Sequence, residues 1–199
     1  MTLQTDQPIQ RLNLQAYNRS VAEFIPRDRD DYELNPPYQR GTVWTPDQRV
    51  ALVHSFLSGT PIPAVILNYR ANDDWTRANG ALSIHDPAYA VVDGKQRIET
   101  IRAWFDGLIA VPASWFDPER VKFTESTSDG QYVNYTGLSI VGQRTARMWT
   151  IPTAEARVAS VEDEAAIYLR VNGGGTAQSA ADMANAEGVR SRTGDRRDS

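Results

Sequence analysis

The sequence predicts an α+β fold in which a small mixed sheet is flanked by helices. Short apolar runs at 64–67 and 89–92 are bounded by helix-breaking residues, which is typical of buried strands. Apolar side chains recur at helical spacing at 50–57 and at 98–105, so one helix precedes the first run and another follows the second. The chain of 199 residues, 41% of them hydrophobic, is long enough to bury a core.

We expect one domain over residues 1–187, with its core at about 34–187. Residues 188–199 lack apolar periodicity and carry four arginines against two aspartates, which predicts a disordered basic tail. The absence of cysteine excludes disulfides and zinc sites built on thiolates. No apolar run approaches the roughly 20 residues that span a bilayer, and the N-terminus lacks a signal-peptide pattern. We therefore expect a cytoplasmic protein without a membrane partner.

The charge pattern allows a local anion site but not a basic surface. A net charge of -4 and a pI of about 5.2 argue against a protein that coats nucleic acid over its whole surface. Lys95 and Lys122 are the only lysines, and the remaining basic residues are arginines. Arginine suits phosphate recognition, although a genome rich in G and C explains the bias equally well.

The N-terminal third begins with polar residues up to about position 20, which predict an arm or a first short strand. The prolines of the segment 34–41 exclude a helix there. This segment is predicted to be extended and to present Tyr38, Gln39 and Arg40.

The next segment is the clearest helix. Thr45 is a suitable N-cap, Pro46 suits the first helical position, Gln48 completes a capping box and Gly59 ends the helix. The polar residues 70–87 predict a loop or an exposed hairpin.

The second half alternates helical and extended patterns. Gly107 closes the helix at 98–105, and residues 108–153 predict one or two strands with long connections. Ser160 is placed to cap a helix that runs to about Arg170. A Gly-rich turn follows, and a short last helix is predicted to end near Glu187.

The stretch VVDGKQRIETI lies where the second predicted strand turns into a helix. Backbone N–H groups and the positive end of the helix dipole meet at this point, so it attracts anions. Gly94 allows close approach, and Lys95 and Arg97 bring positive charge. Asp93 is suited to orient Arg97, to hold a divalent metal beside a phosphate or to accept a proton. The plainer interpretation is that Asp93 caps the helix and that both cations are solvated.

Four blocks in order resemble one family. They are YQRGTVWTP at 38–46, FLSGTPIP at 56–63, VDGKQR at 92–97 and LRVNGGGT at 169–176. Together they resemble the ParB/sulfiredoxin-like domain at the N-terminus of GmrSD-type, modification-dependent restriction enzymes. The resemblance covers about residues 34–187. It departs at Lys95, where the family's D-G-Q-Q-R motif has glutamine.

The resemblance implies a nucleotide pocket that holds ATP or another nucleoside triphosphate with Mg²⁺. By position it implies that Asp93, Gly94, Gln96 and Arg97 line the phosphates. We assign catalytic roles to Asp93, Arg97 and Lys95, with Asp93 also as the metal ligand. The nucleotide-binding residues that we assign are Gln39, Arg40, Gly94, Gln96, Thr100, Arg170 and Asn172.

Three aromatic residues are candidates for DNA contact because aromatic rings stack on unpaired bases. These are Tyr38, Trp44 and Trp75; the other tryptophans are assigned to the core. His54 and His85 have no partner at metal-ligand spacing, and no P-loop motif is present. The family's restriction enzymes cut DNA with a separate C-terminal histidine-asparagine-histidine nuclease domain, and we expect this chain to be a standalone domain without one.

The resulting hypothesis is an enzyme that hydrolyses a nucleoside triphosphate or transfers its phosphoryl group, with DNA, including modified DNA, as acceptor or effector. An alternative is a non-catalytic module that binds DNA in a nucleotide-dependent way or blocks a defence complex. DNA nicking is least favoured, because a nuclease needs more clustered carboxylates than Asp93 and Asp86 offer. Neither the nucleotide base nor the oligomeric state follows from the sequence.

Overall fold

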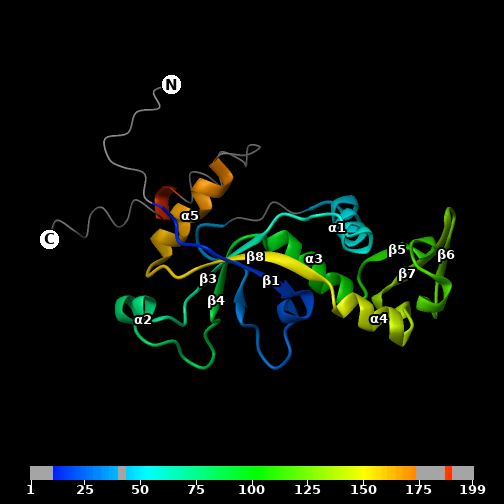
Figure 1. The fold of residues 1–199 in the computed structure, drawn as a ribbon, viewed down its shortest axis with the longest axis horizontal. Helices are drawn as coiled ribbons and strands as arrows, with labels where there is room; N and C mark the ends of the chain where they lie inside the picture. The colour runs from blue at the N-terminus through cyan, green and yellow to red at the C-terminus, as the bar shows by residue number, and fades with distance from the viewer. Residues whose placement is uncertain (1–10, 40–43, 174–186, 190–199) are drawn as a thin grey trace, which may run out of the picture.

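The computed structural model describes residues 11–39, 44–173 and 187–189 (Figure 1). In these ranges the chain forms a five-stranded sheet, a separate three-stranded sheet and helices packed around them, which confirms the predicted α+β class. None of the helices in these ranges is long and apolar enough to cross a membrane. The predicted last helix falls almost wholly outside the described residues, as do Arg40 and most of the basic tail.

The five-stranded sheet is mixed and has the strand order β1-β8-β3-β4-β2. Its strands are β1 (Gln15–Ser20), β8 (Thr150–Ala156), β3 (Val65–Tyr69), β4 (Tyr89–Asp93) and β2 (Tyr32–Glu33). β1 and β8 are antiparallel, as are β3 and β4, whereas β3 runs parallel to β8 and β2 runs parallel to β4. The two apolar runs predicted as buried strands are β3 and β4, in the interior of the sheet.

Both faces of this sheet are covered. Side chains that alternate along β3 and β4 enter two different cores: Val65, Leu67 and Val91 enter one, and Ile66 and Val92 enter the other. The first core is closed by α3 (Lys95–Phe105), α1 (Pro46–Ser58) and the 3-10 helix η1 (Val21–Phe24). The second is closed by α5 (Val161–Gly173). Because both of their faces are buried, β3 and β4 do not alternate between polar and apolar residues.

The three longest helices agree with the local signals in the sequence. At the start of α1 the Thr45 hydroxyl accepts a hydrogen bond from the Gln48 backbone N–H, and the Gln48 side chain accepts one from the Thr45 backbone N–H. At its end Gly59 takes a left-handed conformation with φ of 67°. In α3 the predicted apolar face is buried. Before α5 the Ser160 hydroxyl accepts from the Asp163 backbone N–H at 3.1 Å. These helix starts are confirmed.

One helix lies where we predicted a loop or hairpin. Residues Asp73–Asn79 form α2, and the Asn72 side chain caps it by accepting from the N–H groups of Asp74 and Trp75. Trp75 is buried beneath the Arg70 guanidinium, whose carbon lies 4.5 Å from the centre of the ring. The prediction was wrong because one buried tryptophan anchors an otherwise polar turn of helix.

The segment 108–153 contains more structure than predicted. Its three-stranded antiparallel sheet and α4 lie at one end of the molecule (Figure 1). The elements are β5 (Ala110–Pro112), η2 (Ala113–Trp115), η3 (Pro118–Arg120), β6 (Glu125–Thr127), β7 (Gly130–Asn134), η4 (Tyr135–Gly137) and α4 (Ile140–Arg147). Helix α4 was missed because tertiary packing determines it: a Cβ on Gly142 would lie 2.5 Å from the Arg120 carbonyl oxygen.

A buried ion pair connects α5 to the main sheet. Arg70, directly after β3, donates from Nε and Nη2 to the two carboxylate oxygens of Glu164, each at 2.7 Å. Asn68 donates to the same carboxylate at 2.7 Å, the Tyr38 hydroxyl donates to it at 3.2 Å, and Arg70 also contacts Glu33. Burial alone would lower the pKa of Arg70, but the hydrogen bond to Glu164 and its charge raise this pKa above the usual value. The Arg70 guanidinium therefore stays charged when folded.

We predict that Glu164→Gln lowers the free energy of unfolding by about 3 kcal/mol, because the buried Arg70 charge then keeps only the partly exposed Glu33 carboxylate as its counter-charge. Urea denaturation measures the loss. The control is Asp74→Asn, which breaks an exposed pair with Arg77 whose side chains are 61% and 76% accessible, and which should change stability by less than about 1 kcal/mol. Equal effects of the two substitutions would contradict a structural role for the buried pair.

Candidate functional site

The candidate site is the junction between β4 and α3. β4 ends at Asp93, Gly94 takes a left-handed conformation with φ of 100°, and α3 begins at Lys95. A Cβ on Gly94 would lie 2.9 Å from Val65 Cγ2 and 3.0 Å from Arg97 Nη2. Glycine is therefore required both by the backbone angle and by the neighbours that press against it.

The start of α3 has no side-chain cap. Gly94 occupies the N-cap position without a capping hydrogen bond, and the first turn carries no acidic residue. The other described α-helices begin with a side-chain oxygen that accepts a backbone N–H, from Asn72, Thr45, Ser139 and Ser160. The Arg97 N–H donates to the Gly94 carbonyl at 3.0 Å, so the uncapped turn leaves the N–H groups of Lys95 and Gln96, with the positive end of the helix dipole, for an anion.

Asp93 and Arg97 form an ion pair across this turn. Arg97 Nη2 lies 2.6 Å from Asp93 Oδ2, and the two side chains are 12% and 22% accessible. The same Nη2 donates to the Ala64 carbonyl at 3.0 Å, and Arg97 Nε is buried without a hydrogen-bond partner among the described residues. Of the three roles considered for Asp93, the geometry shows the orienting one: the carboxylate fixes Arg97 beneath Gly94.

Gln39 and Gln96 connect the residues on either side of 40–43 to the junction. Gln39 Nε2 donates to the Val91 carbonyl of β4 at 2.9 Å, and Gln96 Oε1 accepts from the Trp44 backbone N–H at 3.0 Å. The amide groups used in these bonds tie the chain before and after Arg40 to the junction. Both glutamines thus use part of their amide groups to bind the backbone of the protein.

Lys95 is held from two sides. Its Nζ donates to Asn35 Oδ1 and lies 3.8 Å from Glu99 Oε1. Thr100 is buried, and its hydroxyl donates to the Gln96 carbonyl at 2.7 Å. Thr100 is therefore part of the support beneath the junction, and no surface remains on it for direct contact with a nucleotide. Asn35 was not predicted, since nothing in its local sequence marks it as a partner for a lysine 60 positions away.

Two of the predicted nucleotide-binding residues, Arg170 and Asn172, lie on α5. Arg170 is exposed near the end of α5, and Asn172 Nδ2 donates to the Tyr168 carbonyl at 3.0 Å. Helix α5 itself packs against β4. The structure brings this helix to the strand that leads into the site, and a direct role of the two side chains stays a prediction.

The aromatic candidates for DNA contact differ in exposure. Tyr38 is fully buried, and Trp75 is buried under Arg70. Burial, together with the Glu164 charge, raises the pKa of Tyr38 well above its usual value. The expectation that the extended segment presents Tyr38 to a substrate is therefore wrong, as is the exposed loop expected for Trp75. Trp44, whose backbone N–H donates to Gln96, is partly exposed.

No metal centre is preformed in the ranges that the structure describes, because no three His, Asp or Glu side chains gather there in a suitable group. Mg²⁺ bound with a nucleotide often uses one or two carboxylates and takes its other ligands from phosphates and water. Asp93 alone fits that arrangement through the carboxylate oxygen that Arg97 does not hold.

Comparison with protein families agrees with the blocks read from the sequence. The family model of the GmrSD restriction endonuclease N-terminal domain matches residues 21–188. The chain belongs to this family. No curated protein and no solved structure matched the chain. The GmrSD N-terminal domain match includes the whole β4–α3 junction and the main sheet apart from the arm that carries β1.

We predict that Gly94→Ala lowers the free energy of unfolding by about 3 kcal/mol, combining strain at positive φ with overpacking against Val65. Gly59→Ala is the matched control: it has φ of 67° and nothing within 4 Å of the added Cβ, so only the strain of about 1–2 kcal/mol applies. Thermal or urea unfolding of both variants gives the difference. Equal losses would mean that the junction is less tightly packed than described.

Proposed function

We propose that this domain binds ATP or a related nucleoside triphosphate with Mg²⁺ at the β4–α3 junction and uses it in a DNA-directed role. Membership of the GmrSD restriction endonuclease family supports the connection with DNA. The observation that carries the nucleotide assignment is the uncapped start of α3 behind a left-handed glycine. Phosphates are the common ligands of such helix starts.

The charges around the junction favour a phosphate chain. Lys95 and Arg97 bring two cations to the first turn of α3, and each is fixed by a neighbour. Fixed cations lose little entropy on binding, so their attraction for phosphate oxygens is retained in the free energy. Mg²⁺ bound with the nucleotide would neutralise part of the phosphate charge, and Asp93 is the residue that would hold it. Asp93 holds Arg97 in place and offers its second oxygen to that ion.

The reaction is either hydrolysis or transfer of the terminal phosphoryl group to DNA. Both need the terminal phosphate in line with a nucleophile and a group that orients the nucleophile. A second candidate function is a nucleotide-dependent switch that binds DNA without turnover. The commitment of Asp93 to Arg97 and the lack of a carboxylate cluster in the described ranges favour this alternative.

We predict that Lys95→Ala weakens ATP affinity about tenfold in the presence of Mg²⁺, which is typical of losing one charge-assisted hydrogen bond. The control is Lys122→Ala, because Lys122 is the only other lysine of the chain and lies over the Phe123 ring, outside the junction. Titration calorimetry with ATP and Mg²⁺ measures both. Equal affinities of the two variants would place the triphosphate elsewhere.

The same protein incubated with γ-labelled ATP, Mg²⁺ and DNA with 5-hydroxymethylated bases separates the alternatives. Label on DNA indicates phosphoryl transfer, and label released as free phosphate indicates hydrolysis. Label that stays on bound ATP supports the switch. Failure to bind any nucleoside triphosphate, with DNA present or absent, would refute the proposed function.

A further inference from the structure

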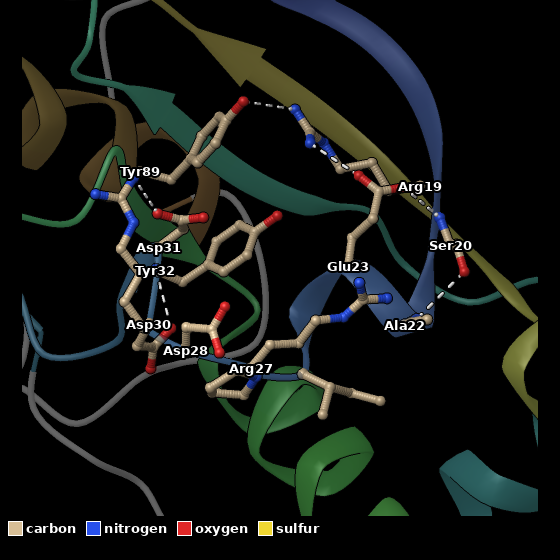
Figure 2. Close-up of a pocket in the computed structure, with 13 residues that line it drawn as sticks. Arg19, Ser20, Ala22, Glu23, Arg27, Asp28, Asp30, Asp31, Tyr32 and Tyr89 are labelled. Carbon is tan, nitrogen blue, oxygen red and sulfur yellow. Dashed lines mark hydrogen bonds and ion pairs between the residues drawn. The ribbon is translucent and has the colours of Figure 1, made fainter.

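A cavity of about 670 Å³ lies at the opposite end of β4 from the junction (Figure 2). Its walls are the end of β1, η1, the loop 25–31 and the first residues of β2 and β4. This volume is within the range of about 300–1,000 Å³ that is usual for small-molecule sites. None of the residues assigned to the nucleotide lines it, so it is a separate feature of the fold.

One wall of the cavity is aromatic. The rings of Tyr32 and Tyr89 are stacked with centroids 5.3 Å apart, and Phe24 lies behind Tyr32 at 4.9 Å. The Tyr32 hydroxyl has no hydrogen-bond partner among the described residues, and Figure 2 shows it facing the open space. Burial raises the pKa of Tyr32 to about 12, an effect partly offset by the Arg19 charge. The hydroxyl therefore keeps its proton and can donate to a ligand.

Most of the charges that line the cavity are paired within the protein. Ion pairs of 2.6–3.2 Å join Arg29 to Asp31, Asp30 to Arg102, and Arg19 to Glu23 and Glu155. Among the described residues that line the cavity, the charged side chains without an ion pair or hydrogen bond are those of Arg27 and Asp28. They are adjacent in the sequence and exposed, and they give the cavity one donor group and one acceptor group that the protein itself does not use.

The overall charge of the lining argues against a phosphate or another acidic ligand. Three arginines face four carboxylates, which gives a formal charge of -1. A ligand that satisfies both Arg27 and Asp28 needs a hydrogen-bond acceptor, a hydrogen-bond donor and no net charge. A flat ring that lies along the tyrosine wall adds apolar contact. The edges of nucleobases combine these features, since arginine pairs with the O6 and N7 of guanine and carboxylates accept from base amino groups.

We propose that this cavity binds a single unstacked nucleobase of DNA, with Arg27 and Asp28 reading its edge and Tyr32 donating to it. That the base comes from DNA rests on the function proposed above. That the cavity suits a base is argued from its lining residues alone. Proteins that receive a base taken out of the stack read it by hydrogen bonds to its edge and by contact with aromatic side chains. This cavity combines the same two features, polar groups for the edge of a base and an aromatic wall, and we therefore assign a base to it.

The test compares a fluorescent single-stranded 12-mer with an abasic chain of the same length, using the full chain and anisotropy. Arg27→Ala and Asp28→Ala are both exposed substitutions that should leave folding intact, and Arg77→Ala and Asp74→Ala on α2 are their matched controls. Each cavity variant should weaken binding of the 12-mer about tenfold. The controls should not, and the abasic chain should bind weakly and show no response to the cavity variants.

The result for Asp28→Ala is decisive because the two mechanisms predict opposite changes in affinity for the 12-mer. Removing a carboxylate strengthens binding if the surface merely attracts the DNA backbone, but weakens it if the carboxylate accepts from a base. Tighter binding, or an abasic chain that binds as well as the 12-mer, would overturn the inference. In a duplex with 2-aminopurine at one position, fluorescence should rise with the wild-type chain and not with Asp28→Ala.

Failure of this inference can be told apart from failure of the proposed function. If only Lys95→Ala reduces binding of the 12-mer, DNA meets the junction and the cavity inference is wrong, while the proposed function stands. If ATP does not bind but the cavity variants behave as expected, the base site stands and the nucleotide assignment is refuted.

Discussion

The buried ion pair between Arg70 and Glu164 is the interaction on which the rest of the structure depends. It joins the end of β3 to α5, and through Tyr38 it also fixes the extended segment that leads to Gln39. Since an unpaired buried charge is costly, the cluster has one low-energy arrangement, in which all of these elements are docked together. The position of Gln39 beside β4, and with it one side of the candidate site, is a consequence of that arrangement.

Local signals predicted those parts of the fold that local physics determines. The capping box of α1, the glycine after it and the apolar runs of β3 and β4 are readable because each depends on residues a few positions apart. Helix α2 depends on burial of Trp75 under Arg70, and α4 on contact between Gly142 and the Arg120 backbone. Such contacts are formed by the tertiary fold, so periodicity in a short polar segment does not reveal them.

In the candidate site, too, some features depend on neighbouring residues in the sequence and others on tertiary contacts. The strand-to-helix turn, the need for glycine and the pairing of Asp93 with Arg97 at i,i+4 were all open to prediction from the motif. The use of Gln39 and Gln96 was not, because their partners lie 52 positions away in the chain. A polar residue in a binding motif can therefore also hold the polypeptide in place. Here both glutamines hold the polypeptide on either side of Arg40.

The two candidate sites lie at opposite ends of one strand. β4 runs from Tyr89, in the wall of the cavity, to Asp93 at the junction, which separates the two by about 13 Å at 3.3 Å per residue. Its central residues Ala90, Val91 and Val92 are fully buried between two cores, so the strand has little freedom to bend. The spacing between the proposed base site at one end and the proposed phosphate site at the other is therefore set by the sheet. A displacement of β4 along its own axis is the simplest movement by which one site would sense the other, and it would have to shear the ladders with β3 and β2 together.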